Sequence, residues 1–154
     1  MEIRKNTLWR APVYCWIAGF VSYCLLLLLY RQFAVVADAE NAVSIDPVKS
    51  LVASGIVFAL AVAGGRLVFQ RMTRKEVFCS VSIVVVFELL MILIQRCVPI
   101  TTSVISLWFL YLDFFTGWCD FILALLFRMG LDTFAAALVA CFTPYLFVLF
   151  GKKE

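Results

Sequence analysis

The sequence predicts an all-α fold, a polytopic transmembrane helical bundle with five spans favoured and four as the alternative. Hydrophobic residues make up 65% of the 154 residues and charged residues 15%, with a mean hydropathy of +1.05. A soluble domain is about 45–50% apolar and about 25% charged. The apolar residues fall in runs of roughly 20, the length that a helix needs to cross a bilayer core about 30 Å thick. The spans occupy nearly the whole sequence, so we expect one integral membrane domain over residues 1–154.

The first three spans are expected at 11–31, 48–69 and 77–95. The first apolar run is longer than the roughly 7–15 apolar residues of a signal peptide, so we expect an uncleaved helix. The second is rich in small residues at three- and four-residue spacing, including Gly64 and Gly65. Such residues let neighbouring helices approach closely, which predicts a central place in the bundle. The third is rich in β-branched residues, but its length favours a membrane helix over a strand.

The last two spans are expected at 103–127 and 131–150. The stretch before Arg128 is longer than one upright crossing needs, so this span either tilts or begins in the interface. Asp132 stands at the start of the fifth span, where an acidic side chain complements the helix dipole and predicts a cap. Pro144 removes a helical hydrogen bond within that span and predicts a kink.

The distribution of Lys and Arg predicts a cytoplasmic N-terminus. With five spans the inner flanks carry Arg4, Lys5, Arg10, Arg66, Arg71, Arg74, Lys75 and Arg128, and the acidic loop around Asp38–Asp46 lies outside. The same topology leaves Lys152 and Lys153 outside, against the rule. Four spans would bring them inside but would leave residues 100–150 only one crossing. The short loops and basic flanks are typical of a bacterial cytoplasmic (inner) membrane.

The composition argues against several classes of function. There is no histidine, which removes histidine bases and most zinc and haem ligation. None of the six cysteines belongs to a CxxC motif or has metal-ligand spacing, so we expect free thiols. The net charge of +3 is too small to indicate nucleic-acid binding. We therefore expect no enzyme activity, no cofactor and no metal site.

Four charged residues inside the spans are the candidate site: Arg66, Glu88, Asp113 and Asp120. A charge near the bilayer centre costs about 2.5–3.5 kcal/mol on insertion scales, so such residues are candidates for function. Asp113 and Asp120 are two helical turns apart and share one face. We expect Arg66 to pair with Asp120, leaving Glu88 and Asp113 as a deeper carboxyl pair. Two interpretations stay open: a polar lock between helices, or a path for an ion, a proton or a substrate.

An aromatic cluster follows the same predicted helix as the two aspartates. Its members are Trp108, Tyr111, Phe115 and Trp118, at spacings of three, four and three residues along one side. This arrangement predicts either an aromatic pocket beside Asp113, or ordinary lipid contact and core packing.

Two functional hypotheses follow from these observations. The first is a non-enzymatic subunit or partner-binding component of a membrane complex, held in the lipid bilayer with a membrane protein partner or as a homo-oligomer. It rests on the lack of a catalytic constellation and on the small-residue helix. The alternative is a small transporter or substrate-binding membrane component that uses the intramembrane charges as a polar path. An intramembrane aspartyl enzyme ranks last, because Asp113 and Asp120 share one helix and lack the GxGD pattern.

Overall fold

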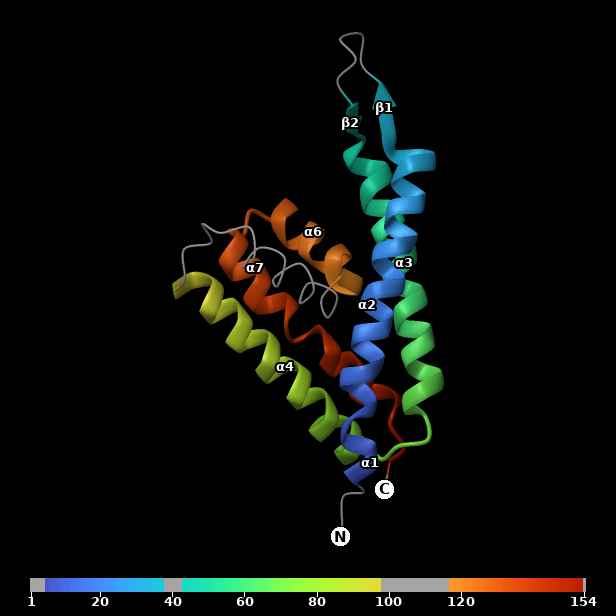
Figure 1. Ribbon diagram of the computed structural model, residues 1–154, viewed down its shortest axis with the longest axis vertical. Helices are drawn as coiled ribbons and strands as arrows, with labels where there is room; N and C mark the ends of the chain where they lie inside the picture. The colour runs from blue at the N-terminus through green and yellow to red at the C-terminus, as the bar shows by residue number, and fades with distance from the viewer. Residues whose placement is uncertain (1–4, 38–42, 98–116, 154) are drawn as a thin grey trace.

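A computed structural model describes residues 5–37, 43–97 and 117–153, and these are helical apart from one short β-hairpin (Figure 1). In chain order the elements are α1 (Lys5–Leu8), α2 (Arg10–Leu29), the π-helical turn η1 (Tyr30–Ala34), β1 (Val35–Ala37), β2 (Val43–Ile45), α3 (Pro47–Phe69), α4 (Arg74–Cys97), the 3₁₀ turn η2 (Gly117–Cys119), α6 (Asp120–Arg128), α7 (Thr133–Ala140) and the 3₁₀ helix η3 (Thr143–Phe150). The hairpin is antiparallel, with Val36 opposite Ser44. The predicted helical bundle is confirmed.

Four helical segments of the described chain are long and apolar enough to cross a membrane, which makes this an integral membrane protein. They are Arg10–Gln32, Pro47–Phe69, Arg74–Cys97 and Thr133–Phe150. These correspond to the predicted first, second, third and fifth spans. The predicted span 103–127 lies in large part outside the described residues. Its described end holds η2 and α6, and α6 is nine residues long, or about 13 Å.

A cation–π contact fixes the end of α4 against the start of α7. The guanidinium carbon of Arg96 lies 5.4 Å from the centroid of the Phe134 ring. Arg96 is in the last turn of α4 and Phe134 in the first turn of α7, so α4 ends and α7 begins at the same level of the bundle. Both termini lie at the opposite end of the molecule (Figure 1). This placement favours the four-span alternative, in which the two ends of the chain share one side of the membrane.

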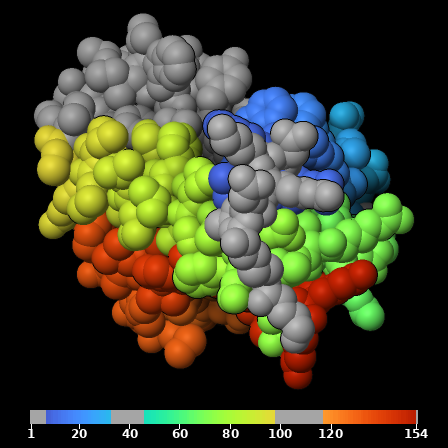
Figure 2. Space-filling view, turned by 90° about the horizontal axis from the view of Figure 1, so that it is seen from below, coloured from blue at the N-terminus to red at the C-terminus, as the bar shows by residue number. Residues whose placement is uncertain are grey.

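The C-terminal residues are bonded to the turn between α3 and α4. The Lys152 N–H donates to the Met72 carbonyl at 2.9 Å, and the Arg74 N–H donates to the Lys152 carbonyl at 3.1 Å. Figure 2, seen from the end that carries both termini, shows these red residues against the green ones of α3 and the turn. Lys152 and Lys153 therefore lie at the same end of the bundle as α1, and not at the opposite end, where five spans would put them. The conflict with the positive-inside rule came from counting a fifth crossing.

Arg128 lies at the hairpin end of the bundle, whereas the five-span topology predicts it on the inner flank, with Arg66 and Arg71. Its Nη2 donates to the Pro47 carbonyl at 2.7 Å, next to the hairpin. The end with both termini accordingly collects Lys5, Arg10, Arg66, Arg71, Arg74, Lys75, Lys152 and Lys153, whereas Arg31, Lys49, Arg96 and Arg128 lie toward the hairpin end. The difference in the number of basic residues between the two ends of the bundle is thus larger than in the five-span topology.

Helix α3 packs against α2, α6 and η3, as its small residues predicted. A side chain at Gly65 would collide with the Phe147 ring, and one at Gly64 would come within 2.8 Å of the Tyr14 hydroxyl. Tyr14 in turn meets Phe69 and Phe147 edge-on, with ring centroids 5.4 and 5.5 Å apart. The core of the bundle therefore forms where two adjacent glycines admit aromatic rings from both neighbouring helices.

Polar contacts join the first helices to α4. The buried Ser80 hydroxyl donates to the Leu8 carbonyl at 2.6 Å and accepts the Ala11 N–H at 3.0 Å, across the break between α1 and α2. Thr73 and Glu76 form a reciprocal capping box at the start of α4, where Glu76 Oε2 accepts the Thr73 N–H at 3.0 Å. These bonds satisfy backbone groups that would otherwise be unpaired at helix ends.

Two local predictions about the last span are confirmed. Asp132 is the N-cap of α7, where its Oδ1 accepts the Ala135 N–H at 2.6 Å. The helix ends at Ala140, and η3 starts at Thr143 with Pro144 in its first turn. The proline has no N–H to continue the α-helical ladder, so the span changes direction there (Figure 1).

We expect Gly65→Ala to lower the free energy of unfolding by about 1–3 kcal/mol, because the added methyl overpacks the contact with Phe147. Alanine favours a helix over glycine by up to about 1 kcal/mol, so intrinsic propensity alone predicts the opposite sign. Unfolding by denaturant in detergent micelles measures the difference. Leu67→Ala, at an exposed position two residues along, is the control and is expected to change stability by less than about 0.5 kcal/mol. Equal stability of Gly65→Ala and the wild type would contradict the close packing.

Candidate functional site

The middle of the bundle holds the junction at which η2 meets α2 and α3. A Cβ built on Gly117 would lie 3.4 Å from the Gly19 carbonyl oxygen, and one built on Gly55 would lie 3.2 Å from the Phe121 ring. Gly19 is near the centre of the first span, and Gly55 is more than two turns inside α3. The start of α6 therefore lies well inside the membrane-spanning part of the molecule, not at its surface.

Glu88 of α4 is buried next to this junction. Only 3% of the residue is exposed. Within the part of the chain that the structure describes, its two carboxyl oxygens are the only buried side-chain oxygens or nitrogens without a hydrogen-bond partner. Buried polar groups are almost always hydrogen-bonded, since an unpaired one costs about 1–3 kcal/mol. A group kept at such a cost inside a membrane span is a candidate for function.

Three buried thiols lie within electrostatic range of Glu88: Cys15 of α2, Cys119 of η2 and Cys141 after α7. Cys141 Sγ donates to the Leu138 carbonyl at 2.9 Å. All six cysteines are free, as the sequence predicted. No pattern in the sequence indicates this cluster, because its members come from four separate elements.

The cluster has a limited chemical repertoire. Among the described residues, no three carboxyl or thiol side chains come close enough together to hold a metal ion. The three thiols are buried, so a reactant dissolved in water has no direct access to them. The buried Glu88 carboxyl can hold a proton or bind a small cation.

The expected pair of Arg66 and Asp120 is not present. Both residues are exposed, and no ion pair joins them within the described chain. Phe121, next to Asp120, lies at the level of Gly55, and Gly55 precedes Arg66 by eleven residues, or about 16 Å along the helix. The prediction failed because it assumed a full fourth crossing that brought Asp120 toward the inner end. Instead, α6 starts deep in the bundle and runs toward the hairpin end.

Most of the predicted aromatic pocket lies outside the described residues. This applies to Trp108, Tyr111 and Phe115, and also to Asp113. Trp118 is described, and it is 1% exposed. Its ring stacks on Phe58 at a centroid distance of 5.9 Å and lies 5.1 Å from the Phe147 ring. Trp118 is thus part of the packed core, which agrees with the packing alternative for this residue.

We expect Glu88→Met to raise the free energy of unfolding by about 1–3 kcal/mol, because it replaces an unpaired buried carboxyl with an apolar chain of similar length. Denaturant unfolding in micelles measures the effect. The matched control is Glu76→Met on the same helix, which breaks the capping box and is expected to lower stability by about 1 kcal/mol. A Glu88→Met variant less stable than the wild type would mean that the carboxyl does have a stabilising partner.

Comparisons with protein-family models, with curated proteins and with solved structures find no match to this chain. The features of the described chain that bear on its function are the buried Glu88 cluster, the exposed Asp120 at the start of α6, and the surfaces around them.

Proposed function

We propose that this protein is a non-enzymatic subunit, a partner-binding component of a membrane complex. The observation that carries the proposal is the exposure of Asp120 at the start of α6, deep within the membrane-spanning region. Carboxylates inside membrane spans face protein or a water-filled cavity and not lipid, because lipid cannot solvate them. An exposed carboxylate at this depth predicts that a second polypeptide covers this side of the bundle.

The form of α6 supports the same proposal. The helix has no buried residue, and at nine residues it is less than half as long as a bilayer core is thick. The chain changes at Cys119 from the 3₁₀ turn η2 to α6 inside the bundle. Helix ends and irregular backbone within the hydrocarbon region are tolerated only where protein or water covers them. Trp118 and Cys119 of η2 are covered by the bundle itself, whereas α6 has no buried residue, so a neighbouring subunit on the α6 side would cover that helix.

The distribution of charge supports a role without chemistry of its own. The three described site residues, Arg66, Glu88 and Asp120, do not meet one another. An active site needs a nucleophile or base with an orienting group within hydrogen-bond reach, and the described part of the chain offers no such set around Glu88. The partner is a membrane protein, or a second copy of this chain, that covers the α6 side of the bundle.

The proposed location is a bacterial cytoplasmic membrane, with both termini on the cytoplasmic side. The support is the gathering of basic residues at the end that holds the two termini, because Lys and Arg flanks are retained in the cytoplasm. The hairpin end, with β1 and β2, then faces outward.

The test is the mass of the complex that the tagged protein forms in mild detergent, measured for the wild type and for Asp120→Leu. We expect the wild type to elute with a stoichiometric second chain, and Asp120→Leu to elute alone while keeping its helical circular dichroism. Removing a buried interfacial charge partner costs about 2–5 kcal/mol, which is at least a tenfold loss in affinity.

The control is Lys153→Leu, which also removes an exposed charge but lies at the far end of the molecule. We expect it to retain the partner. A wild type that stays monomeric in nanodiscs, or an Asp120→Leu complex as tight as that of the wild type, would contradict the proposal.

A second candidate function, a small transporter or substrate-binding component, is favoured by one observation. Glu88 is a buried carboxyl without a described partner, among thiols contributed by α2, η2 and the end of α7. Carboxyls in this situation carry protons or coupling cations in transporters.

For this candidate we expect purified protein in liposomes to carry a pH-driven proton or cation flux that Glu88→Gln abolishes. Glutamine keeps the shape of the side chain but cannot exchange a proton. Flux is read with a pH dye inside the vesicles, and Glu76→Gln, outside the buried cluster, serves as the control. Identical traces for wild type, Glu88→Gln and empty vesicles would reject transport.

A further inference from the structure

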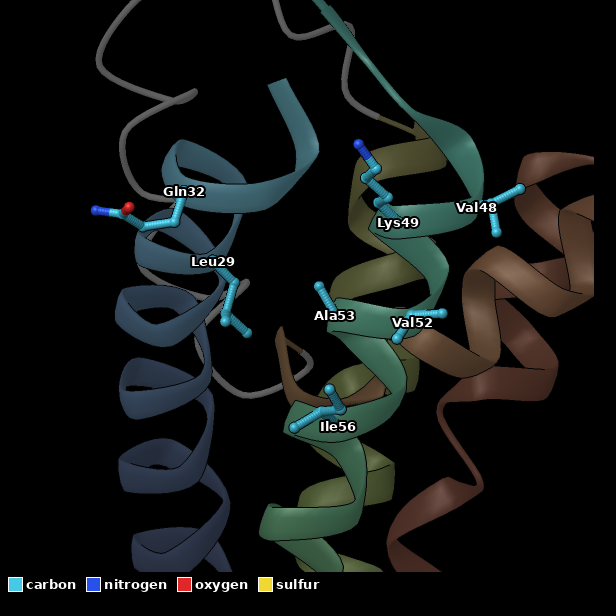
Figure 3. Close-up of a pocket in the computed structure, with 7 residues that line it drawn as sticks. All are labelled: Leu29, Gln32, Val48, Lys49, Val52, Ala53 and Ile56. Carbon is cyan, nitrogen blue, oxygen red and sulfur yellow. The ribbon is translucent and has the colours of Figure 1, made fainter. Parts of the chain in front are cut away.

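A groove of about 590 Å³ lies between α2 and α3 near the hairpin end of the bundle. Figure 3 shows Leu29 pointing from α2 toward α3, with Ala53 and Ile56 facing back from α3. These side chains and Val52 make the wall of the groove apolar. The volume falls within the roughly 300–1,000 Å³ typical of sites for small ligands.

The polar side chains of the groove are confined to one end. Gln32 and Lys49 both lie toward the hairpin, and the ammonium nitrogen of Lys49 stands above the apolar residues in Figure 3. Lys49 is in the first turn of α3, and Ile56 follows seven residues later, about 10 Å deeper along the helix axis. The groove therefore has a cationic end at the level of the lipid headgroups and an apolar end at the level of the acyl chains.

The Lys49 ammonium has room for an anion. The Lys49 side chain is 54% exposed, and its contact with Asp46 Oδ2 is long, at 3.9 Å. The Asp46 carboxylate is engaged elsewhere: its Oδ1 caps α3 by accepting the N–H groups of Val48 and Lys49, and these bonds lower the pKa of Asp46. A second cation, Arg128, is bound to the carbonyl of Pro47 at the same helix end. The local charge thus favours a negatively charged ligand.

We propose that this groove binds one anionic phospholipid, with its phosphate at Lys49 and an acyl chain along Leu29, Ala53 and Ile56. A phospholipid of this kind matches the groove in two respects. Its negative phosphate complements Lys49, and its acyl chain reaches the depth of Ile56 when the phosphate is at Lys49. A zwitterionic phospholipid carries its own ammonium group, which competes with Lys49 for the phosphate. The surrounding bilayer supplies the ligand, so no soluble compound is required.

The probes are dioleoylphosphatidylglycerol and dioleoylphosphatidylcholine, added to delipidated full-length protein and counted as adducts by native mass spectrometry. We expect one phosphatidylglycerol to bind more tightly than phosphatidylcholine. Lys49→Gln is expected to weaken phosphatidylglycerol binding about fivefold, the effect of one basic residue at an anionic surface, and Lys49→Arg to preserve it. Lys153→Gln, at the opposite end, is the charge control and is expected to bind as the wild type does.

A second variant tests the apolar part of the site. Ile56→Trp is expected to fill the groove and to weaken both lipids, whereas Leu67→Trp, an exposed residue on the same helix three turns away, leaves binding unchanged. Circular dichroism establishes that each variant is folded. Asp120→Leu is expected to keep its lipid adduct, so loss of the partner subunit and loss of the lipid are distinguishable.

Three results would overturn the proposal. One is equal affinity for the two lipids, and another is Lys49→Gln binding phosphatidylglycerol as the wild type does. The third is a protein dimer that Ile56→Trp dissociates while the lipid adducts persist, because the groove would then be occupied by a second chain.

Discussion

The contact of Gly64 and Gly65 with the rings of Tyr14 and Phe147 is the constraint on which the rest of the bundle depends. Within a membrane the hydrophobic effect does not drive helices together, so their association relies on close packing and on hydrogen bonds between them. The two glycines let α2 and η3 approach neighbouring faces of α3. Trp118 extends the same aromatic core, which brings η2 into the interior and sets where α6 can begin.

The bonds of Lys152 to the α3–α4 turn complete this arrangement at one end of the molecule. They hold the last residues of the chain beside the capping box of Thr73 and Glu76, close to where Ser80 holds α1 against α4. At the other end, Arg96 packs on Phe134 and Arg128 binds the start of α3. Polar contacts therefore join the helices at the two ends of the bundle, whereas its middle contains Glu88, a buried carboxyl without a hydrogen-bond partner among the described residues.

Local patterns in the sequence predicted much of this fold. Hydropathy located the four spans, Asp132 was identified as a cap by its place before an apolar run, and Pro144 as a break by its missing N–H. These features depend on a few neighbouring residues, so a linear pattern is enough to find them. Gly64 and Gly65 are also a local pattern, because small residues within a span indicate a close approach of a neighbouring helix.

The site was less predictable because it depends on how distant segments are placed in depth. A full crossing over 103–127 would put Asp120 near Arg66. It would also put Arg128 and Lys152 each at the opposite end of the bundle from where the structure has them. Four of the five predicted spans agree with helical segments of the structure, but no pattern in the sequence indicates the direction in which α6 runs. The thiols around Glu88 come from α2, η2 and the end of α7, and no spacing rule connects them.

The packing of Phe147 against Gly65 also has a consequence for biosynthesis. The ribosome delivers α3 to the membrane long before it delivers η3, so the space above Gly65 stays unfilled while the first three spans are already inserted. The core closes only when the last span arrives. A nascent chain that has not yet reached Phe147 therefore has an unfilled space beside Gly65, between the helices already inserted.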